Sequence, residues 1–235
     1  IGVFNNEVKL IKYDYANSNM LGTDGDYNAN PFVASSNSTY RGSHTTVSKY
    51  SWNNNGSNTW SESGLNTVNL NTNYINYLNG IDTKWANMIG MRDWQVGGAP
   101  WDYINSASAK ARYQNEVSSP SEDIKETAKV GLMYVSDYGY AADPSYWTTE
   151  MRRSDGQDYR LATTSNWMHM GLYEWIILRN SVYTTSSFYV DLVGYVGYNN
   201  VSTYFNAARP VFYLASNVAY DGGTGEINSP IRLSL

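Results

Sequence analysis

The 235-residue chain has no cysteine, only two histidines, and few charged residues, which make up 16% of the sequence. Without cysteine, the protein has no disulfide, no thiolate metal site and no thiol nucleophile. His44 and His169 alone offer little for a histidine-based metal site or triad, and we interpret both as structural. Nucleotide-binding, nucleophile-elbow and zinc-protease motifs are also missing. We therefore expect no enzyme activity, no cofactor and no bound metal.

Positive charge is scarce as well. Sixteen Lys and Arg residues stand against 21 Asp and Glu, which gives a net charge of −5, and only Arg152 and Arg153 are adjacent. This balance argues against nucleic acid and anionic membranes as partners. No stretch reaches the roughly 18 apolar residues of a membrane helix, so we predict no direct membrane insertion. Because the chain begins at Ile1, we expect a processed or truncated piece whose leader or anchor is out of view.

Neutral polar residues are what the sequence has in abundance. The mean hydropathy is −0.49 despite the low charge, because Asn, Ser, Thr, Gly and 22 Tyr residues dominate. Tyr, Ser, Gly and Asn are also the residues that antibody paratopes use for contact. Codon bias in an AT-rich genome is an alternative reason for the excess of Asn.

The order of elements predicts one α+β domain spanning residues 1–235, with helices in the first half and short antiparallel strands mainly in the second. Helical spacing of apolar residues covers 61–78, and shorter helices are expected over 82–89 and 107–116. Residues 3–15, 91–96 and the apolar run 129–135 are predicted as strands, and Asp221-Gly222-Gly223 as a tight hairpin turn. Later strands are expected over 175–178, 188–193, 195–201, 210–214 and 231–235.

Three weaker patterns for chemistry are present. Oxygen-bearing side chains alternate from Asp24 to Asn30, as in a calcium loop, but Gly and Glu are missing at the deciding positions, so an Asx-rich turn is favoured. Glu150, Asp155 and Asp158 could form a carboxylate pair for glycoside hydrolysis, although the intervening arginines favour a charge-compensated loop. Six tryptophans could stack on sugars or fill the core: Trp60, Trp94, Trp101, Trp147, Trp167 and Trp175.

Several segments in combination resemble one known family. The C-terminal matches are GLMYVSDYGYA at 131–141, NWM at 166–168, EW at 174–175, GYV at 194–196 and ARPVFYL at 208–214. Upstream, DYANSNMLGTD at 14–24 and WSESGLNTVNLN at 60–71 look like the same family. Together these segments resemble uncharacterised surface domains of Gram-positive gut bacteria, and the resemblance covers nearly the whole chain.

The resemblance implies a C-type-lectin-like fold related to the formylglycine-generating enzymes. It also implies an extracellular, cell-surface or pilus-associated location, because such domains often follow prepilin-type N-termini. The segment before Arg209-Pro210 is similar to the diversified region of variable proteins made by diversity-generating retroelements. The chain lacks the cysteine pair and the three histidines of the catalytic relatives and the motifs of calcium-dependent sugar binding. The fold is therefore no evidence of catalysis.

The region between Trp175 and Leu214 contains the candidate binding face. Alternation places Tyr189 and Asp191 on the sheet face opposite Phe188 and Val190. Such a face suits recognition, although exposed strand faces are polar in any case. Arg209 is interpreted as structural, paired with carbonyls or a carboxylate inside the fold. The predicted binding residues are Tyr183, Thr185, Ser187, Tyr189, Asp191, Tyr198, Asn199, Asn200, Ser202, Tyr204 and Asn206.

Three functions follow in order of preference. The first is a non-catalytic adhesion or recognition module for a protein or glycan on another cell, a host or a phage. The second is a structural pilin-type subunit, which an exposed apolar patch away from the binding face would favour. The third is a carbohydrate-active enzyme, which requires two carboxylates about 5–9.5 Å apart in one cleft.

Overall fold

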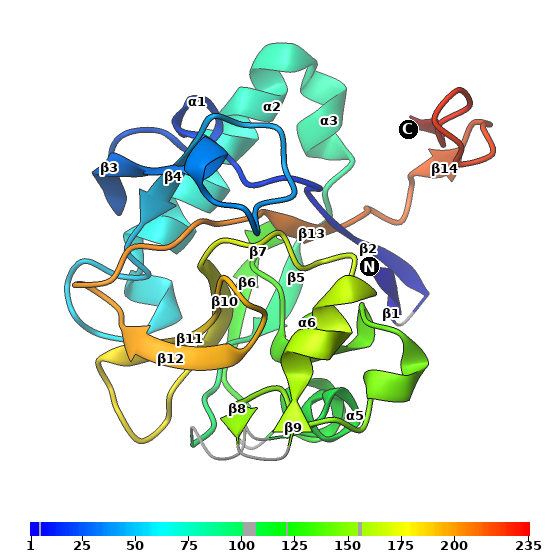
Figure 1. Ribbon diagram of the computed structural model, residues 1–235. Helices are drawn as coiled ribbons and strands as arrows, with labels where there is room; N and C mark the ends of the chain where they lie inside the picture. Colours follow the sequence, from blue (N-terminus) through cyan, green and yellow to red (C-terminus); the bar gives the residue numbers. More distant parts are fainter. Residues whose placement is uncertain (5, 101–106, 121, 155–156) are drawn as a thin grey trace.

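Two antiparallel sheets form the centre of the computed structural model, which describes residues 1–4, 6–100, 107–120, 122–154 and 157–235 (Figure 1). The first sheet has the order β1-β2-β13-β7 and the second the order β10-β11-β12. Tyr213 pairs with Lys9 and Val211 with Ile11, so strands far apart in the sequence are neighbours in the first sheet. The strands of these sheets are β1 (Gly2–Phe4), β2 (Glu7–Ile11), β7 (Val130–Gly131), β10 (Glu174–Arg179), β11 (Ser186–Val190), β12 (Val196–Asn200) and β13 (Val211–Tyr213).

Short strand pairs surround these sheets. Each is a two-stranded antiparallel ladder. They pair β3 (Tyr27–Val33) with β4 (Thr46–Tyr50), β5 (Arg92–Gln95) with β6 (Lys125–Ala128), β8 (Arg153–Ser154) with β9 (Gln157–Asp158), and β14 (Ala219–Tyr220) with β15 (Leu233–Ser234).

Helices are short and lie outside the sheets (Figure 1). A π-helical segment, Leu65–Tyr74, continues into α2 (Ile75–Ile81), as the apolar spacing predicts. The side chain of Asp82 caps α3 (Thr83–Asn87), and that of Ser108 caps α5 (Ala109–Tyr113). The others are α1 (Ser18–Leu21), α6 (Val135–Tyr140), π-helical Gln114–Ser118, and the 3-10 turns Ala34–Ser36, Trp60–Glu62, Pro144–Tyr146 and Tyr159–Thr164.

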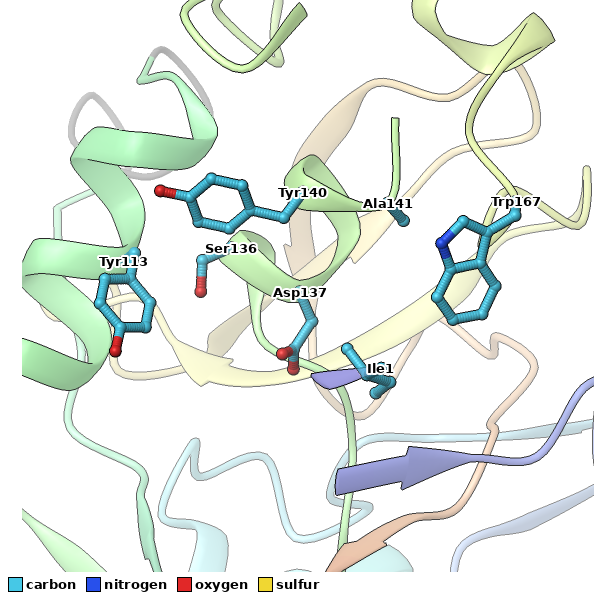
Figure 2. Close-up of a pocket in the computed structure, with 7 residues that line it drawn as sticks. All are labelled: Ile1, Tyr113, Ser136, Asp137, Tyr140, Ala141 and Trp167. Carbon is cyan, nitrogen blue, oxygen red and sulfur yellow. The ribbon is translucent and has the colours of Figure 1, made fainter. Parts of the chain in front are cut away.

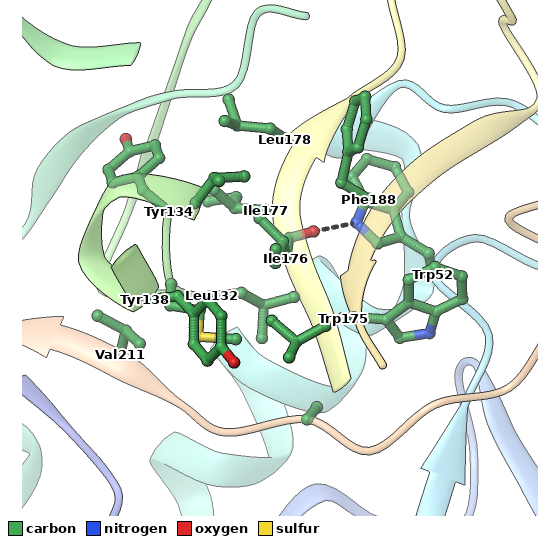
Figure 3. Close-up of a cluster of buried hydrophobic side chains, with 14 of the residues drawn as sticks. Trp52, Leu132, Tyr134, Tyr138, Trp175, Ile176, Ile177, Leu178, Phe188 and Val211 are labelled. Carbon is green, nitrogen blue, oxygen red and sulfur yellow. Dashed lines mark hydrogen bonds between the residues drawn. The ribbon is translucent and has the colours of Figure 1, made fainter. Parts of the chain in front are cut away.

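Aromatic and aliphatic side chains together fill the core (Figure 3). Trp52, Trp175 and Phe188 are fully buried. The indole N–H groups are satisfied by main-chain carbonyls: Trp52 Nε1 donates to Ile176 O at 2.9 Å and Trp175 Nε1 to Tyr50 O at 2.7 Å. These bonds fix the second sheet against the segment that follows β4, because a buried indole must keep its hydrogen bond.

The predicted α+β class is confirmed, but the predicted segregation of helices is wrong. Helix α6 and two 3-10 turns lie in the second half, while β1 to β5 lie in the first. The run 129–135 forms a strand only at Val130–Gly131, because Asp137 accepts the Tyr134 N–H at 2.8 Å and starts α6 there.

The turn predicted at Asp221-Gly222-Gly223 is also misplaced. Asp221 N donates to Arg232 O and Arg232 N to Gly222 O, so the paired region continues past these residues. The chain reverses later, where Ser229 N donates to Glu226 O.

Candidate ligand-binding surface

The second sheet presents the predicted alternation, but its outer face is largely covered. Phe188 and Val190 are buried in the core, and Tyr189 lies on the opposite side. The Tyr189 ring packs against Tyr173 at 5.7 Å and edge-on against Trp175 at 6.3 Å between centroids. Burial raises the pKa of Tyr189 to about 12. This residue is therefore mainly a packing residue.

Two of the predicted binding residues are buried, so the expectation that they point outward is wrong. Ser187 has no exposed surface, and its hydroxyl donates to Leu178 O at 2.7 Å. Asn206 is 3% exposed, and its main chain pairs with Tyr50 in both directions.

Tyr198 lies on the other face from Tyr189, because it is paired directly with Phe188. The predicted set is thus divided between the two faces of the sheet. Tyr183 and Tyr204 lie on the loops that connect β10 to β11 and follow β12, and Tyr198 lies in the middle of β12.

Two of these tyrosines, Tyr183 and Tyr204, are exposed, and Tyr183 stacks on Tyr198. The rings of Tyr183 and Tyr198 are stacked, with centroids 5.8 Å apart and an interplanar angle of 13°. Tyr183 is 47% and Tyr204 is 50% exposed. Small hydroxyl residues surround them. We call this the tyrosine surface, and it consists of Tyr183, Thr184, Thr185, Tyr198, Asn199, Ser202, Thr203 and Tyr204, together with Asn54 and Asn55.

Asparagine side chains beneath the surface hold its loops. The amide nitrogen of Asn58, which is 1% exposed, donates to Asn180 O at 2.7 Å, Tyr183 O at 3.0 Å and Ser186 O at 2.8 Å. Asn180 Oδ1 accepts from the main-chain N–H groups of Val182 and Tyr183. The conformation of the loop between β10 and β11 is therefore fixed from below.

The loop after β12 is held in the same way. Asn200 Oδ1 accepts from the N–H and hydroxyl groups of both Ser202 and Thr203, at 3.0–3.1 Å. This is an Asx-type turn, in which a side chain replaces a main-chain acceptor. Asn200, predicted as a binding residue, thus mainly shapes the surface.

The chain after β4 completes the surface. The N–H groups of Trp52 and Asn53 donate to Val201 O, and Asn58 N donates to Thr184 O. These bonds place exposed Asn54 and Asn55 beside the two loops that carry Tyr183 and Tyr204. The predicted binding residues do not include the run Asn53-Asn54-Asn55. Its uncharged, Asn-rich composition is visible in the sequence, but the segment with which it pairs is not.

Charge is nearly absent from these segments. Residues 180–206 contain one charged residue, Asp191, and residues 50–60 contain none. Asp191 Oδ1 accepts from Val193 N and Tyr195 N at 2.9 Å, so this carboxylate closes the turn between β11 and β12. The tyrosine surface offers ring faces, hydroxyls and amides to a ligand.

The alternative sites have structural roles where the structure describes them. Asp26 accepts N–H groups of Asn54 and Leu65 at 3.0 and 2.8 Å, and Asp24 accepts the side chain of Asn73. These contacts fit the predicted Asx-rich turn at Asp24–Asp26, whereas the rest of the predicted range, up to Asn30, belongs to β3. Among the residues that the structure describes, no group of three or more His, Asp or Glu side chains could hold a metal.

The described residues place the carboxylate and tryptophan patterns only in part. Glu150 accepts from Arg152 Nε at 3.1 Å, while Asp155 and the side chain of Asp158 lie outside the described residues. Trp60, Trp94 and Trp175 are buried, Trp147 is half-buried, Trp167 is 50% exposed, and Trp101 lies outside the described residues.

Arg209 has the structural role that the sequence predicts. It is 1% exposed and forms a two-pronged ion pair with Glu174, at 2.7 and 2.8 Å. It also donates to Met168 O at 2.6 Å and to Tyr13 O at 3.3 Å. The guanidinium thus ties β10 to the segment before β13.

No protein-family model matches the sequence, and neither a curated protein nor a solved structure is significantly similar to the chain. The family resemblance stays a prediction for this reason. In the part of the chain that the structure describes, no helix has the length and apolar character needed to cross a bilayer.

Proposed function

We propose that the chain is a non-catalytic, extracellular recognition module that binds a protein or glycan through the tyrosine surface. The observation that carries the proposal is the exposed ring of Tyr183, which stacks on the partly buried ring of Tyr198 and lies on a loop anchored by buried asparagines. Tyrosine gives a large contact area with only two side-chain torsions to immobilise. Loops that are already fixed add little ordering cost on binding.

The chemistry of the surface supports an uncharged ligand face. A stacked ring pair suits the apolar face of a sugar or of an aromatic side chain, and the hydroxyls of Thr185 and Ser202 suit its polar edge. With a single carboxylate between residues 180 and 206, long-range attraction contributes little, so binding is expected to depend weakly on salt.

The C-type-lectin-like fold and the cell-surface or pilus-associated location belong to the same proposal. Their support is the combination of sequence motifs, including the Arg209-Pro210 segment that precedes β13. Display on a surface is compatible with a fold stabilised by packing and main-chain hydrogen bonds, without disulfides.

A binding screen on glycan and host-protein arrays tests the proposal. The test variant carries Tyr183→Ala, Tyr198→Ala and Tyr204→Ala, and the matched control carries Tyr13→Ala and Tyr220→Ala, which are 69% and 65% exposed elsewhere. We expect the wild type and the control to bind a common ligand and the test variant to lose at least tenfold in affinity, about 1.4 kcal/mol. If the test variant binds the ligand with unchanged affinity, the binding site is not the tyrosine surface.

A structural pilin-type subunit is the second candidate, and the C-terminal hairpin favours it. This hairpin, β14–β15, projects from the rest of the molecule (Figure 1), with Ile227 95% and Ile231 51% exposed. Exposed apolar side chains of this kind mark contact sites. Concentration-dependent light scattering separates the candidates: self-association that Ile227→Ser and Ile231→Ser abolish, without any ligand on the arrays, favours the subunit.

A further inference from the structure

A lysine and an aspartate meet deep in the protein, away from the tyrosine surface. Lys9 comes from β2 and Asp137 from α6, and each is less than 5% exposed. The distance between Lys9 Nζ and Asp137 Oδ2 is 2.5 Å. The carboxyl carbon lies one bond beyond that oxygen, which brings Nζ near the range of about 3–3.5 Å at which reacting atoms are poised.

Aromatic rings enclose this pair. Lys9 Nζ lies 4.3 Å from the ring centroid of Tyr134 and 5.6 Å from those of Trp94 and Tyr213. Burial among these rings removes hydration from the lysine ammonium and so disfavours its charged form. Burial lowers the pKa of Lys9, although Asp137 opposes this. The neutral amine, which is the nucleophilic form, is therefore accessible.

A second carboxyl group is anchored beside Asp137. Glu116 is 3% exposed, and its Oε2 accepts the N–H of Ser136, the residue before Asp137, at 2.9 Å. Its Oε1 has no hydrogen-bond partner among the described residues. Burial raises the pKa of Glu116 to about 7, against the opposing effect of Ser136. At neutral pH this carboxyl can both give and take a proton.

We propose that Lys9 and Asp137 condense into an intramolecular amide bond. Nζ of the neutral lysine attacks the carboxyl carbon of protonated Asp137, a C–N bond forms, and the C–O bond to Oδ1 breaks. That oxygen leaves as water, carrying the carboxyl proton and one amine proton, and Glu116 passes the amine proton to it. No oxidant or co-reactant is needed.

Main-chain and cavity geometry fit this step. The Tyr134 N–H donates to Asp137 Oδ2 at 2.8 Å, so it can stabilise the oxygen that becomes the amide carbonyl. Asp137 and Ser136 also line a small cavity of about 60 Å³, together with Tyr113, Tyr140 and Trp167 (Figure 2). A water molecule needs only about 10–15 Å³ of such space, so the product has room to leave.

Intact mass spectrometry of the denatured protein tests the proposal. We expect the purified wild type to be lighter than its sequence mass by one water. Lys9→Arg should have its full sequence mass, while the control Lys12→Arg, which alters a neighbouring half-buried lysine, should keep the deficit. Asp137→Asn should lose one ammonia in place of one water, because its leaving group is nitrogen.

Peptide mapping distinguishes the amide from other losses of water. Cyclisation of Asp-Gly sequences such as Asp24-Gly25 also removes water, but it does not depend on Lys9 and leaves peptides unbranched. A branched peptide joining the segments around Lys9 and Asp137 confirms the bond. A wild-type protein with full mass, or a deficit that persists in Lys9→Arg, overturns the proposal.

The role of Glu116 has its own test. Glu116→Gln keeps the size of the side chain and removes its ability to transfer a proton. We therefore expect the mass deficit to appear at least tenfold more slowly than in the wild type, measured from the time at which the chain is synthesised and folds. Circular dichroism spectra identical to those of the wild type exclude misfolding as the cause. If this variant condenses at the wild-type rate, Glu116 is not the group that transfers the proton. The proposal does not depend on the proposed binding function.

Discussion

At the scale of single residues, burial separates His169 from His44. His169 is 4% exposed, and its pKa is lowered to about 4, first by burial and then by the charge of Arg41. His44 is half-exposed, with its Nε2 3.5 Å from an Asp14 oxygen. One histidine is thus kept neutral inside the protein, in agreement with the structural role predicted for it.

His169 makes the protein sensitive to acid. Its pKa is lower in the folded than in the unfolded chain, so the unfolded chain binds more protons between pH 6.5 and 4. The stability is present above pH 6.5 and is lost as the pH falls through this window. We expect the wild type to lose about 3 kcal/mol relative to His169→Gln between pH 7 and pH 4. Urea unfolding of both proteins at each pH measures the difference, and parallel curves would contradict it.

At the scale of elements, loops depend on buried amides more than on their own sequences. Asn58 lies in a loop, is 122 to 128 residues from the carbonyls that it binds, and nonetheless fixes the connection between β10 and β11. The side-chain amide of Asn58 has two hydrogens and three carbonyl acceptors, so one hydrogen is shared between two carbonyls. Removing the donors leaves three carbonyls without that partner.

Asn58→Asp tests this dependence. The substitution keeps the size of the side chain but places a carboxylate against the carbonyl oxygens of Asn180, Tyr183 and Ser186. We expect a loss of roughly 1–3 kcal/mol or more in unfolding free energy and faster hydrogen exchange in residues 181–186. The control Asn55→Asp adds the same charge on an exposed residue of the same loop and should change stability by less than about 0.5 kcal/mol.

Elements with clear periodicity were predictable from the sequence, and pairing was not. The apolar spacing of Leu65, Leu70 and Leu78 placed the long helix, and the run Trp175–Leu178 placed β10. Alternation put Tyr189 opposite Phe188, as observed. The face of Tyr198 depends on the register of β11 with β12, and one strand alone does not determine register. The site was found only in part for this reason.

At the scale of the whole molecule, one buried ion pair joins the two sheets. Glu174 begins β10 and Arg209 precedes β13 by two residues. Both are almost fully buried, and the guanidinium also binds carbonyls of Tyr13 and Met168. Burial raises the pKa of Glu174 although Arg209 opposes it. A charge left alone at this place would have no water to stabilise it.

Breaking the pair should destabilise the whole fold. We expect Arg209→Met to lower the unfolding free energy by roughly 3–5 kcal/mol, because Glu174 is left buried and unpaired. The double variant Glu174→Leu, Arg209→Met should recover much of that loss. In the exposed pair of Arg152 and Glu150, Arg152→Met should cost less than about 1 kcal/mol. Urea unfolding measures all three, and equal losses in both pairs would refute the assignment.

The anchoring of the tyrosine surface from below has a consequence for how the protein can evolve. The side chains of Asn58, Asn180 and Asn200 hold the loops in their conformations. The outward side chains of Thr184, Thr185 and Thr203 hold no loop other than the turn in which they lie. Substitutions among the outward residues are therefore nearly neutral for folding and free to drift. A library randomised at these positions, with the three asparagines kept, should consist mostly of folded members, so new specificities would be available without compensating changes in the core.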